Sequence, residues 1–338
     1  EIINHLKTFD DQGECHQRIL SLSQEDRLVL IVSGRCGRQL VPQIHHLRQV
    51  SSIYVYCMDK KANELWTKDF TKIKSVIGEL KDIIHVIRQD QQSRVKIEEP
   101  LSINLLNGNF VHSLLLIDVL IRMKSIESDK QQLIQLCKKE YENNQKELVF
   151  VGEFEKDYRS DKALWWYTRD TFLYKMLNKA LRVQNIDLLF LLRFVIGDIY
   201  QQLKLYQQQS PIRVFRGQVI SIDELDTLRQ SINNLISINS FFSTSTNHQK
   251  AVGFLNSTEI TSDLCRVLFV IDADPQEVKS KPFADISSLS DFDNESEVLF
   301  MIGSIFRLTK IEETKDKDIV TIYMELCGDD EHDLKELF

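Results

Sequence analysis

Apolar side chains in the first 95 residues recur at two different spacings, and the two spacings alternate. Residues 27–34 and 51–59 are short, nearly continuous apolar runs, which are typical of strands buried in a parallel sheet. Residues 37–49 and 62–88 instead place apolar side chains three or four positions apart, as one or two amphipathic helices do. The order strand, helix, strand, helix predicts a small α/β domain with a parallel sheet over residues 1–95.

The rest of the chain divides at Pro211 into a helical part and a strand-rich part. Residues 96–210 carry helical spacing almost throughout. After Pro211 the spacing predicts helices at 221–235 and 248–256. It predicts strands at residues 212–217, 240–246, 265–272, 296–302, 304–313 and 319–327.

Composition is that of a soluble globular protein, with 338 residues, 43% hydrophobic residues and 27% charged residues. The length is sufficient for two ordinary domains or one large domain, and the 11 glycines and 5 prolines argue against long flexible linkers. The net charge is −8, and basic pairs such as Lys60 and Lys61 are scattered and do not form a stripe. A nucleic-acid partner is therefore not expected.

Cysteine and histidine positions show no metal-binding spacing. The six cysteines form no CxxC pair, and the eight histidines form no HxxxH, HExxH or HxH motif. Several cysteines lie in apolar segments, as in YVYCMD at 54–59, so we expect reduced core cysteines in a reducing compartment. We expect no metal cofactor and an intracellular, cytoplasmic protein.

The longest apolar stretches fall short of a membrane span. Residues 114–121 and 186–196 are interrupted by Asp118 and Arg193, so we interpret them as buried helices. The sequence does not begin with methionine, and residues 1–9 already have helical spacing. We therefore expect a further element upstream, which leaves a removed targeting signal open.

One candidate site follows the first predicted strand. The segment SGRCG at 33–37 joins that strand to a helix, and Asp59 ends the next strand, which is the outline of a dinucleotide-binding unit. Gly34 and Gly37 do not complete the G-x-G-x-x-G pattern, so a tight turn with a helix cap is the simpler interpretation. A phosphoacceptor role for Asp59, as in receiver-type domains, is no better supported.

Three features of the strand-rich part place polar groups where a sheet favours apolar ones. Arg216 ends the strand at 212–217, and a buried guanidinium requires a partner. The segment SFFSTST at 240–246 puts hydroxyls on both faces of a strand. Glu295 and Glu297 precede the apolar run VLFMI and, in an extended chain, point the same way. Each feature alone also fits an exposed strand end or a solvated loop.

In this order, the strand arginine, the Ser-Thr-Ser strand and the Glu-x-Glu pair resemble the R-S-E signature of mono-ADP-ribosyltransferases, the family of arginine-specific vertebrate enzymes and clostridial-type toxins. Residues 164–182, LWWYTRDTFLYKMLNKALR, are similar to the helix before the family's first NAD strand. The resemblance covers roughly residues 155–327. It implies an α+β chain with a mixed β-sandwich catalytic domain at 156–330 and NAD as co-substrate. The helical residues before this domain, 96–155, are expected to form a connector.

The resemblance also implies roles for individual residues. Glu297 is the expected catalytic carboxylate, which stabilises the positive charge that develops on the ribose as the bond to nicotinamide breaks. Arg216 is expected to bind the pyrophosphate of NAD, since a guanidinium fits phosphate oxygens in a bidentate manner. Gly217 is expected to let the dinucleotide approach the backbone. Ser243 is expected to bond the ribose and to orient Glu297.

Further residues complete the implied site. Thr244 and Ser245 are expected to shape their strand, and Phe254 is expected to hold nicotinamide in a bent pose. Glu295 matches the family position at which glutamate accompanies transfer to arginine, so we expect a protein arginine as the acceptor. Phe292 is expected either to offer an aromatic surface to the target or to pack within its loop.

Two other functions are compatible with these residues. In an NAD glycohydrolase, water replaces the acceptor and the site is the same. In a non-catalytic signalling or scaffold protein, the transferase-like part is a relic, although the intact Arg216, Ser243 and Glu297 argue against a relic. The partner of the domain at 1–95 is left open, with an inhibitory or a targeting role as the hypothesis.

Overall fold

The computed structural model describes residues 7–22, 28–47, 49–79, 81–84, 86, 87, 103–105, 108–257, 260, 264–278, 280–291, 296–313 and 318–328. The chain separates into two units, Glu1–Val95 and Lys96–Phe338. Each unit has its own hydrophobic core.

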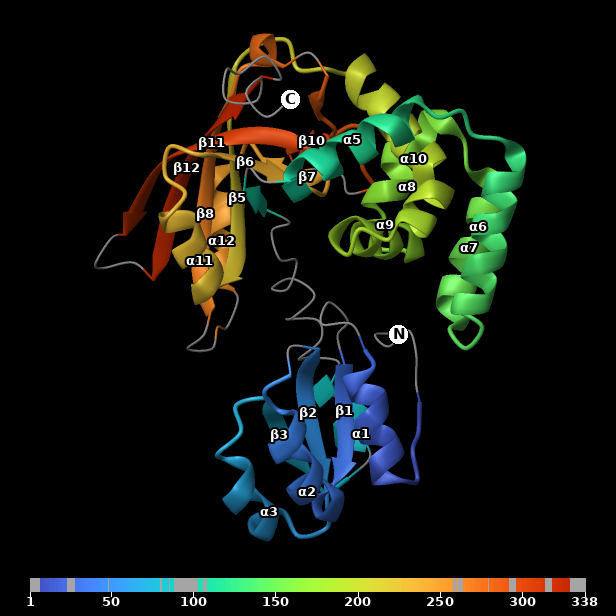
Figure 1. The fold of residues 1–338 in the computed structure, drawn as a ribbon, viewed down its shortest axis with the longest axis vertical. Coiled ribbons are helices and arrows are strands. Elements are labelled where there is room, and N and C mark those ends of the chain that lie inside the picture. The colour runs from blue at the N-terminus through green and yellow to red at the C-terminus, as the bar shows by residue number, and fades with distance from the viewer. Residues whose placement is uncertain are drawn as a thin grey trace. The chain divides into compact units, whose positions relative to one another are not determined.

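The N-terminal unit contains, within the described residues, a three-stranded parallel sheet with helices packed on it (Figure 1). Its strands are β1 (Leu28–Ser33), β2 (Val50–Tyr56) and β3 (Ile73–Ile77), in the order β1-β2-β3. Its helices include α1 (Gln12–Leu20), α2 (Gly34–Ile44) and α3 (Lys60–Thr67). Ile19 of α1, Leu40 of α2 and Ile53 of β2 belong to one core. The predicted small α/β domain with a parallel sheet is confirmed.

The one or two helices predicted over 62–88 are interrupted by a strand that was not predicted. The chain is helical to Thr67 and again at 81–84, 86 and 87, but β3 lies between these segments. Ile73 and Ile77 are four positions apart, a spacing that suits one face of a helix and also one face of a strand. β3 pairs in parallel with β2, so hydrogen bonds to the neighbouring strand favour the extended conformation.

The helical spacing at the start of the chain is not realised where the structure describes it. Residues 7–9 are not helical, and residues 1–6 lie outside the described residues. The first described helix is α1, and Asp11 caps it by accepting a hydrogen bond from the Glu14 backbone N–H at 2.8 Å.

Helices dominate the first half of the C-terminal unit, as predicted. Those described are α5 (Gly108–Arg122), α6 (Glu127–Glu140), α7 (Gln145–Asp157), α8 (Ala163–Thr168), α9 (Phe172–Arg182) and α10 (Ile186–Leu205). They share one core, which also includes Leu299 from the sheet and Phe241, the residue directly before a strand. This core contains residues from both sides of position 155, the expected end of the helical connector.

Charged residues within the apolar helices have charged partners. Arg193 of α10 is 4% exposed and forms an ion pair with Asp129 of α6. Asp118 of α5 accepts a hydrogen bond from Lys281 Nζ at 2.5 Å. Because an ionised group inside a protein requires such partners, these pairs explain how apolar helices tolerate the charges. Within the described residues, no helix is both long enough and apolar enough to cross a membrane.

The strands of the C-terminal unit form one mixed sheet, which has nine strands within the described residues. Its order is β4-β6-β11-β12-β8-β5-β7-β10-β9; among these strands β8 and β12 pair in parallel and the others antiparallel. The strands are β4 (Ile103–Leu105), β5 (Ile212–Ser221), β6 (Leu235–Ile238), β7 (Phe242–Ser245), β8 (Leu264–Ala273), β9 (Phe283–Asp285), β10 (Glu297–Phe300), β11 (Ser304–Glu313) and β12 (Ile319–Cys327). Helices α11 (Ile222–Arg229) and α12 (His248–Asn256) connect strands.

The large sheet bends so that its two ends face each other around a phenylalanine core. Phe300 of β10 and Phe306 of β11 lie 5.5 Å apart between ring centroids, although these strands are not neighbours in the sheet. Phe242 of β7 lies 5.9 Å from the same Phe306. The three rings belong to one buried cluster, so the sheet encloses a core as two layers do. The predicted α+β class is confirmed.

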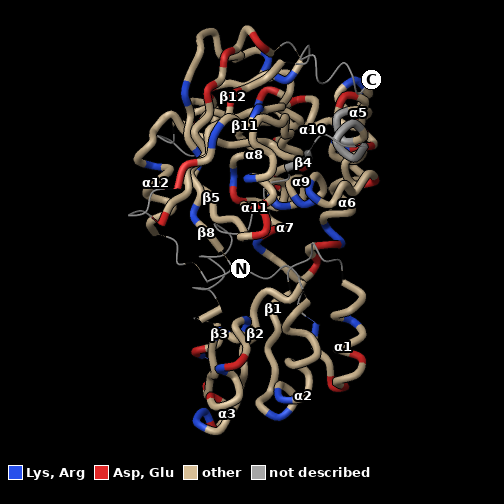
Figure 2. Tube along the Cα trace, turned by 60° about the vertical axis from the view of Figure 1, so that its left-hand side comes forward, with Lys and Arg blue, Asp and Glu red and all other residues tan. Residues whose placement is uncertain are grey.

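Charges of both signs are interspersed along the described chain (Figure 2). Arg213 of β5, for example, forms a bidentate pair with Asp272 of β8, with N–O distances of 2.6 and 2.7 Å. Such exposed pairs contribute about 0–1 kcal/mol each, so they affect solubility more than stability.

Candidate active site

Three strands that are far apart in the sequence lie next to one another in the sheet. The order β5-β7-β10 places the strand of Arg216 beside that of Ser243, and the strand of Ser243 beside that of Glu297. β7 and β10 pair antiparallel with Ser245 opposite Glu297, and β5 meets β7 where Phe215 pairs with Ser245. The sheet order therefore brings together the three polar segments identified in the sequence.

Ser243 and Glu297 are joined directly through their side chains. Ser243 Oγ donates a hydrogen bond to Glu297 Oε1, with an O–O distance of 2.5 Å. The strand register accounts for this contact, because Ser243 is two positions from the residue opposite Glu297 and projects from the same face of the sheet. Glu297 is 8% exposed, and a buried carboxylate requires such hydrogen bonds.

The side chain of Arg216 contacts the backbone of Ser243. Arg216 Nη1 donates to the carbonyl oxygen of Ser243 at 2.7 Å, and Nε donates to Gln218 Oε1 at 2.9 Å. The guanidinium carbon lies 5.1 Å from the centre of the Phe242 ring, in a cation–π arrangement. Arg216, Ser243 and Glu297 thus form one connected group of polar contacts.

Thr244 and Ser245 fix β7 to its surroundings. Thr244 Oγ1 donates to the Val298 carbonyl at 2.8 Å and is buried. Ser245 Oγ accepts a hydrogen bond from the Asn247 N–H at 3.1 Å, where the chain turns into α12. Contact of either hydroxyl with a ligand stays a prediction.

The structure shows a packing role for Gly217, and its predicted role in NAD binding stays a prediction. We expected it to let a dinucleotide approach the backbone, and a Cβ at this position would lie 2.2 Å from the Ala251 carbonyl oxygen and 2.9 Å from Leu255 Cγ. Both belong to α12, which packs against β5 at this point. Gly217 is therefore needed for the close approach of a helix to the sheet.

Phe254 lies on α12 and is half-buried in the cluster formed by this helix with β5 and β8. Phe215 belongs to the same cluster and pairs with Ser245 of β7. This cluster therefore borders the strand that carries Ser243. The contact of Phe254 with nicotinamide stays a prediction.

The chain does not enter β10 in the extended conformation that we assumed. Ser296 has a φ of 48°, in the left-handed region, and the strand begins at Glu297. The expectation that Glu295 and Glu297 point the same way depended on extended backbone at 296, so it is corrected. Glu295 itself and Phe292 lie outside the described residues.

Two residues of this region were missed in the sequence. Gln218 accepts from Arg216, and its position two residues further on the same strand face was a usable signal. Ser287 accepts a hydrogen bond from the Glu297 N–H at 2.9 Å, but it lies in a connection without periodicity. No sequence pattern indicates such a contact.

The candidate site of the N-terminal unit has a structural explanation. Ser33 Oγ accepts from the Cys36 N–H at 3.3 Å and caps α2, and Asp59 accepts from the Ala62 N–H at 3.1 Å and caps α3. A Cβ at Gly34 would lie 2.7 Å from Asn63 Oδ1. These contacts agree with the simpler interpretation, a tight turn with a helix cap. In the described part of the chain, no three His, Cys, Asp or Glu side chains gather as a metal would require.

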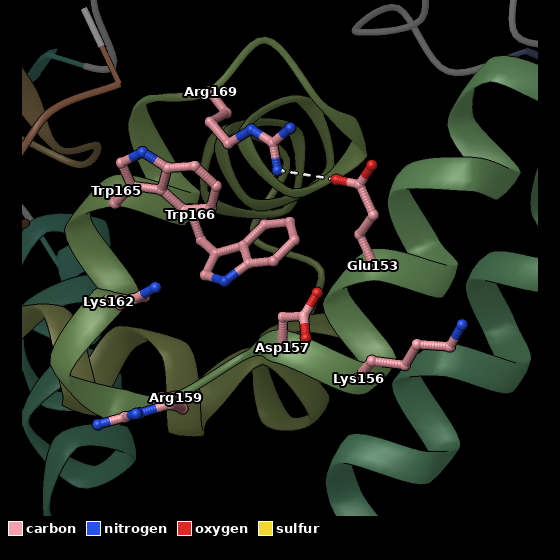
Figure 3. A pocket seen from close by; sticks show the side chains of 8 residues that line it. All are labelled: Glu153, Lys156, Asp157, Arg159, Lys162, Trp165, Trp166 and Arg169. Carbon is pink, nitrogen blue, oxygen red and sulfur yellow. Dashed lines mark hydrogen bonds and ion pairs between the residues drawn. The ribbon is translucent and has the colours of Figure 1, made fainter.

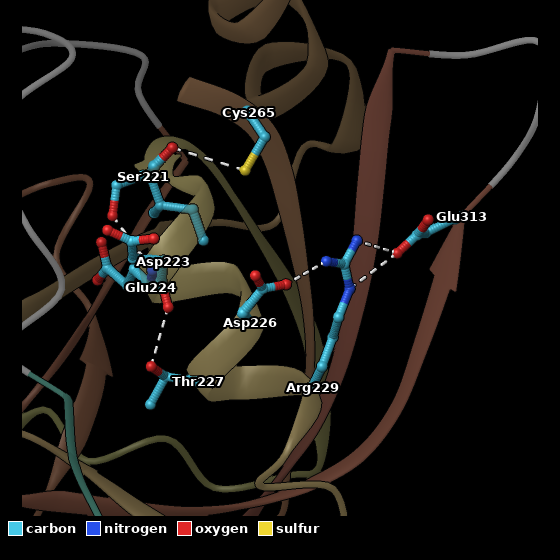
Figure 4. Close-up of polar contacts among 9 residues, drawn as sticks. Ser221, Asp223, Glu224, Asp226, Thr227, Arg229, Cys265 and Glu313 are labelled. Atoms are coloured by element: carbon cyan, nitrogen blue, oxygen red, sulfur yellow. Dashed lines mark hydrogen bonds and ion pairs between the residues drawn. The ribbon is translucent and has the colours of Figure 1, made fainter. Parts of the chain in front are cut away.

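Cys265 is unsuited to act as a nucleophile. Its thiol donates to the Ile220 carbonyl with an S–O distance of 3.5 Å, near the acidic residues of α11 (Figure 4). Burial and the neighbouring carboxylates raise the pKa of the Cys265 thiol to about 11, although Arg229 opposes them. Arg229 itself is paired with Asp226 and Glu313.

A pocket of about 360 Å³ lies among the helices (Figure 3). It is lined by Glu153, Lys156, Asp157, Arg159, Lys162, Trp165, Trp166 and Arg169. The Arg169 guanidinium lies 4.5 Å from the Trp165 ring centre and 5.0 Å from that of Trp166, and it donates to Glu153 at 3.1 Å. An arginine of the chain itself thus occupies this aromatic surface. None of the predicted site residues lines the pocket.

Comparison with protein-family models finds no match, and comparison with curated proteins finds none either. Among solved structures, the chain is similar to the C3 exoenzyme of Clostridium limosum, with 17% identity, coverage of 51% of this chain and 86% of that chain, and a TM-score of 0.38. It is similar to the ADP-ribosyltransferase HopU1 of Pseudomonas syringae pv. tomato, with 16% identity, coverage of 66% and 99%, and a TM-score of 0.40. It is also similar to the ADP-ribosyltransferase Vis of Vibrio splendidus, with 21% identity, coverage of 62% and 89%, and a TM-score of 0.33. The sequence identities and TM-scores of these similarities are too low to carry a functional argument. The functional conclusion therefore rests on the residues of this chain.

Proposed function

We propose that the protein is an NAD-dependent mono-ADP-ribosyltransferase, which releases nicotinamide and transfers ADP-ribose to a protein arginine. The observation that carries the proposal is the hydrogen bond from Ser243 Oγ to Glu297, together with the contact of Arg216 to the carbonyl of the same serine. A carboxylate and a guanidinium joined through one serine supply the two charges that the reaction requires. One stabilises a cationic ribose, and the other binds a pyrophosphate.

In the proposed reaction, the bond between the nicotinamide nitrogen and ribose C1′ breaks, and its electron pair leaves with nicotinamide. Positive charge develops on C1′, and the Glu297 carboxylate stabilises it. The acceptor nitrogen then donates its electron pair to C1′, which forms the new C–N bond, and loses a proton to solvent water. Ser243 has one hydroxyl hydrogen and donates it to Glu297 Oε1, so it aims the carboxylate.

The binding of NAD is assigned to residues around β7. Arg216 binds the pyrophosphate, since its planar fork of donors suits phosphate oxygens. Phe254 packs against nicotinamide, and its support is the cluster that it shares with Phe215 beside Ser245. Ser243 contacts the ribose in addition to Glu297, because a hydroxyl oxygen still accepts hydrogen bonds after donating one.

The proposal that the acceptor of ADP-ribose is an arginine rests on Glu295. Its carboxylate, two positions before Glu297, pairs with the incoming guanidinium and holds it near ribose C1′. We assign the acceptor to a protein side chain. The proposed reaction uses no metal.

The test is incubation of the full chain with labelled NAD and a small guanidino compound, with nicotinamide and the adduct scored separately. The wild-type protein should produce both. Glu295→Gln should still release nicotinamide but should form no adduct, because only the acceptor loses its partner.

The results of this assay distinguish a transferase from an NAD glycohydrolase and from a non-catalytic scaffold. Nicotinamide without adduct from the wild-type protein indicates an NAD glycohydrolase. Adduct formation by Glu295→Gln at the wild-type rate would show that the acceptor assignment is wrong. A wild-type protein that does not bind NAD at millimolar concentration favours a non-catalytic scaffold.

A further inference from the structure

The backbone of Glu297 is held on both sides by the short segment that follows β9. The Glu297 N–H donates to Ser287 Oγ at 2.9 Å, and the Glu297 carbonyl accepts from the Ile286 N–H at 2.8 Å. The first of these contacts uses a side chain where a sheet would ordinarily use a backbone carbonyl. The peptide groups of the proposed catalytic residue are thus connected to two consecutive residues.

Ser287 is itself fixed by Asp285. Ser287 Oγ donates to Asp285 Oδ1 at 2.6 Å, and the Ser287 N–H donates to the same oxygen at 2.9 Å. A hydroxyl has one hydrogen, so Ser287 gives it to Asp285 and accepts from Glu297 with its lone pair. The hydroxyl of Ser287 therefore makes its hydrogen bonds to Asp285 and to Glu297 in a single rotamer. The bond to Asp285 is strengthened because its acceptor is a carboxylate.

The residue before Glu297 shows why such support is needed. Ser296 has a φ of 48°, which is unfavourable for a residue with a Cβ. Its carbonyl accepts from the Thr246 N–H at 3.0 Å. A strained conformation persists only where neighbouring contacts determine it, and here Thr246 holds one side and Ser287 the other.

We propose that Ser287, oriented by Asp285, is a positioning residue that sets the direction of the Glu297 carboxylate. This inference rests on the proposed function, because it concerns the cleavage of NAD by Glu297. Ser287 acts through the backbone of Glu297, whereas Ser243 acts on its carboxylate. Loss of the Ser287 hydroxyl releases the N–H of Glu297, and the carboxylate then samples directions that do not face the ribose.

The variants for the test are Ser287→Ala, which removes the hydroxyl, and Ser287→Thr, which keeps it. Ser288→Ala is the matched control, since Ser288 is the next residue and is exposed. We expect Ser287→Ala to lower kcat for nicotinamide release about 10- to 100-fold, because small misplacement of a catalytic group has effects of this size. The KM for NAD should change less than about threefold, since binding is assigned to other residues. Ser287→Thr should recover most of kcat.

A second readout does not depend on activity. Hydrogen exchange at the Glu297 amide should be faster in Ser287→Ala than in the wild-type protein, and unchanged in Ser288→Ala. Unchanged exchange and unchanged kcat in Ser287→Ala would overturn the positioning role. Lower thermal stability with unchanged kcat would also overturn it, because that result indicates a purely structural serine. A wild-type protein that releases no nicotinamide overturns the proposed function, and the exchange measurement still decides whether Ser287 holds this backbone.

Discussion

At the scale of single residues, the polar groups near the sheet are placed by specific partners. Glu297 is 8% exposed and accepts from Ser243, and Arg216 donates to the carbonyl of that serine. Arg193 and Asp129 pair within the helical core in the same way. Removing one partner of a buried charge costs about 3–5 kcal/mol, whereas an exposed pair contributes about 1 kcal/mol or less.

The thiols provide a prediction with a defined pH dependence. The pKa of Cys265 is raised to about 11, so its reactive thiolate is scarce at pH 8 and increases as pH rises. Cys36 is exposed and should react with iodoacetamide first. Between pH 8 and 10 the labelling rate of Cys265 should rise about tenfold per pH unit, since each unit below the pKa reduces the thiolate fraction tenfold.

Labelling is measured by mass spectrometry of digested protein after timed quenching. Labelling of Cys265 at the rate of Cys36 at pH 8 would contradict the raised pKa. A rate for Cys265 that stops rising near pH 9 would contradict it as well.

Sequence reasoning at this scale identified residues that conflict with their own segment. Arg216 and Glu297 are charged residues in otherwise apolar segments, so each could be identified from the sequence alone. Ser287 was not visible, because its importance comes from a contact with Glu297, ten positions away, across a connection without periodicity. Gly217 was selected as a position where a dinucleotide approaches the backbone, which stays a prediction, and the structure shows that α12 also approaches closely there.

At the scale of elements, the contact of α12 with β5 locates the strand that carries Arg216. Ala251 and Leu255 of the helix lie directly over Gly217. Close packing of this kind leaves no space for a methyl group at residue 217. A substitution of Gly217 therefore tests whether α12 packs against β5 at this point.

Gly217→Ala should destabilise the protein by about 1–3 kcal/mol, because a methyl group forced into a packed contact has a cost of this size. Gly253→Ala is the control on the same helix, where a Cβ would have no neighbour within 4 Å. It should stabilise the protein by about 0.5–1 kcal/mol, since alanine favours the helix over glycine. Urea unfolding of both variants gives the comparison. Equal stability of the two variants would show that α12 does not pack on Gly217.

The elements that could be predicted from the sequence are those with sustained periodicity. β11 and β12 were expected at the residues where they occur, and so was α12. The short strands β4, β6 and β9 have three or four residues each, too few to show a period. β3 was mistaken for a helix, because pairing with β2 decides its conformation.

At the scale of the whole chain, the candidate site is a product of sheet order. Ser243 and Glu297 are 54 positions apart, and Arg216 and Ser243 are 27 apart, yet their strands are neighbours. The order of strands in a sheet is not encoded by the spacing of any one segment. The sequence could therefore suggest the three residues through their order and resemblance, but the fold was needed to bring them into contact.

The most direct test separates binding of NAD from its cleavage in Glu297→Gln. Calorimetry should give a Kd for NAD within about threefold of the wild-type value, because Arg216 and the surrounding strands bind the dinucleotide in this account. Nicotinamide release should be slower by about 100-fold or more, since a preorganised charge acts mainly on the transition state. Nicotinamide release by Glu297→Gln at the wild-type rate would contradict the account.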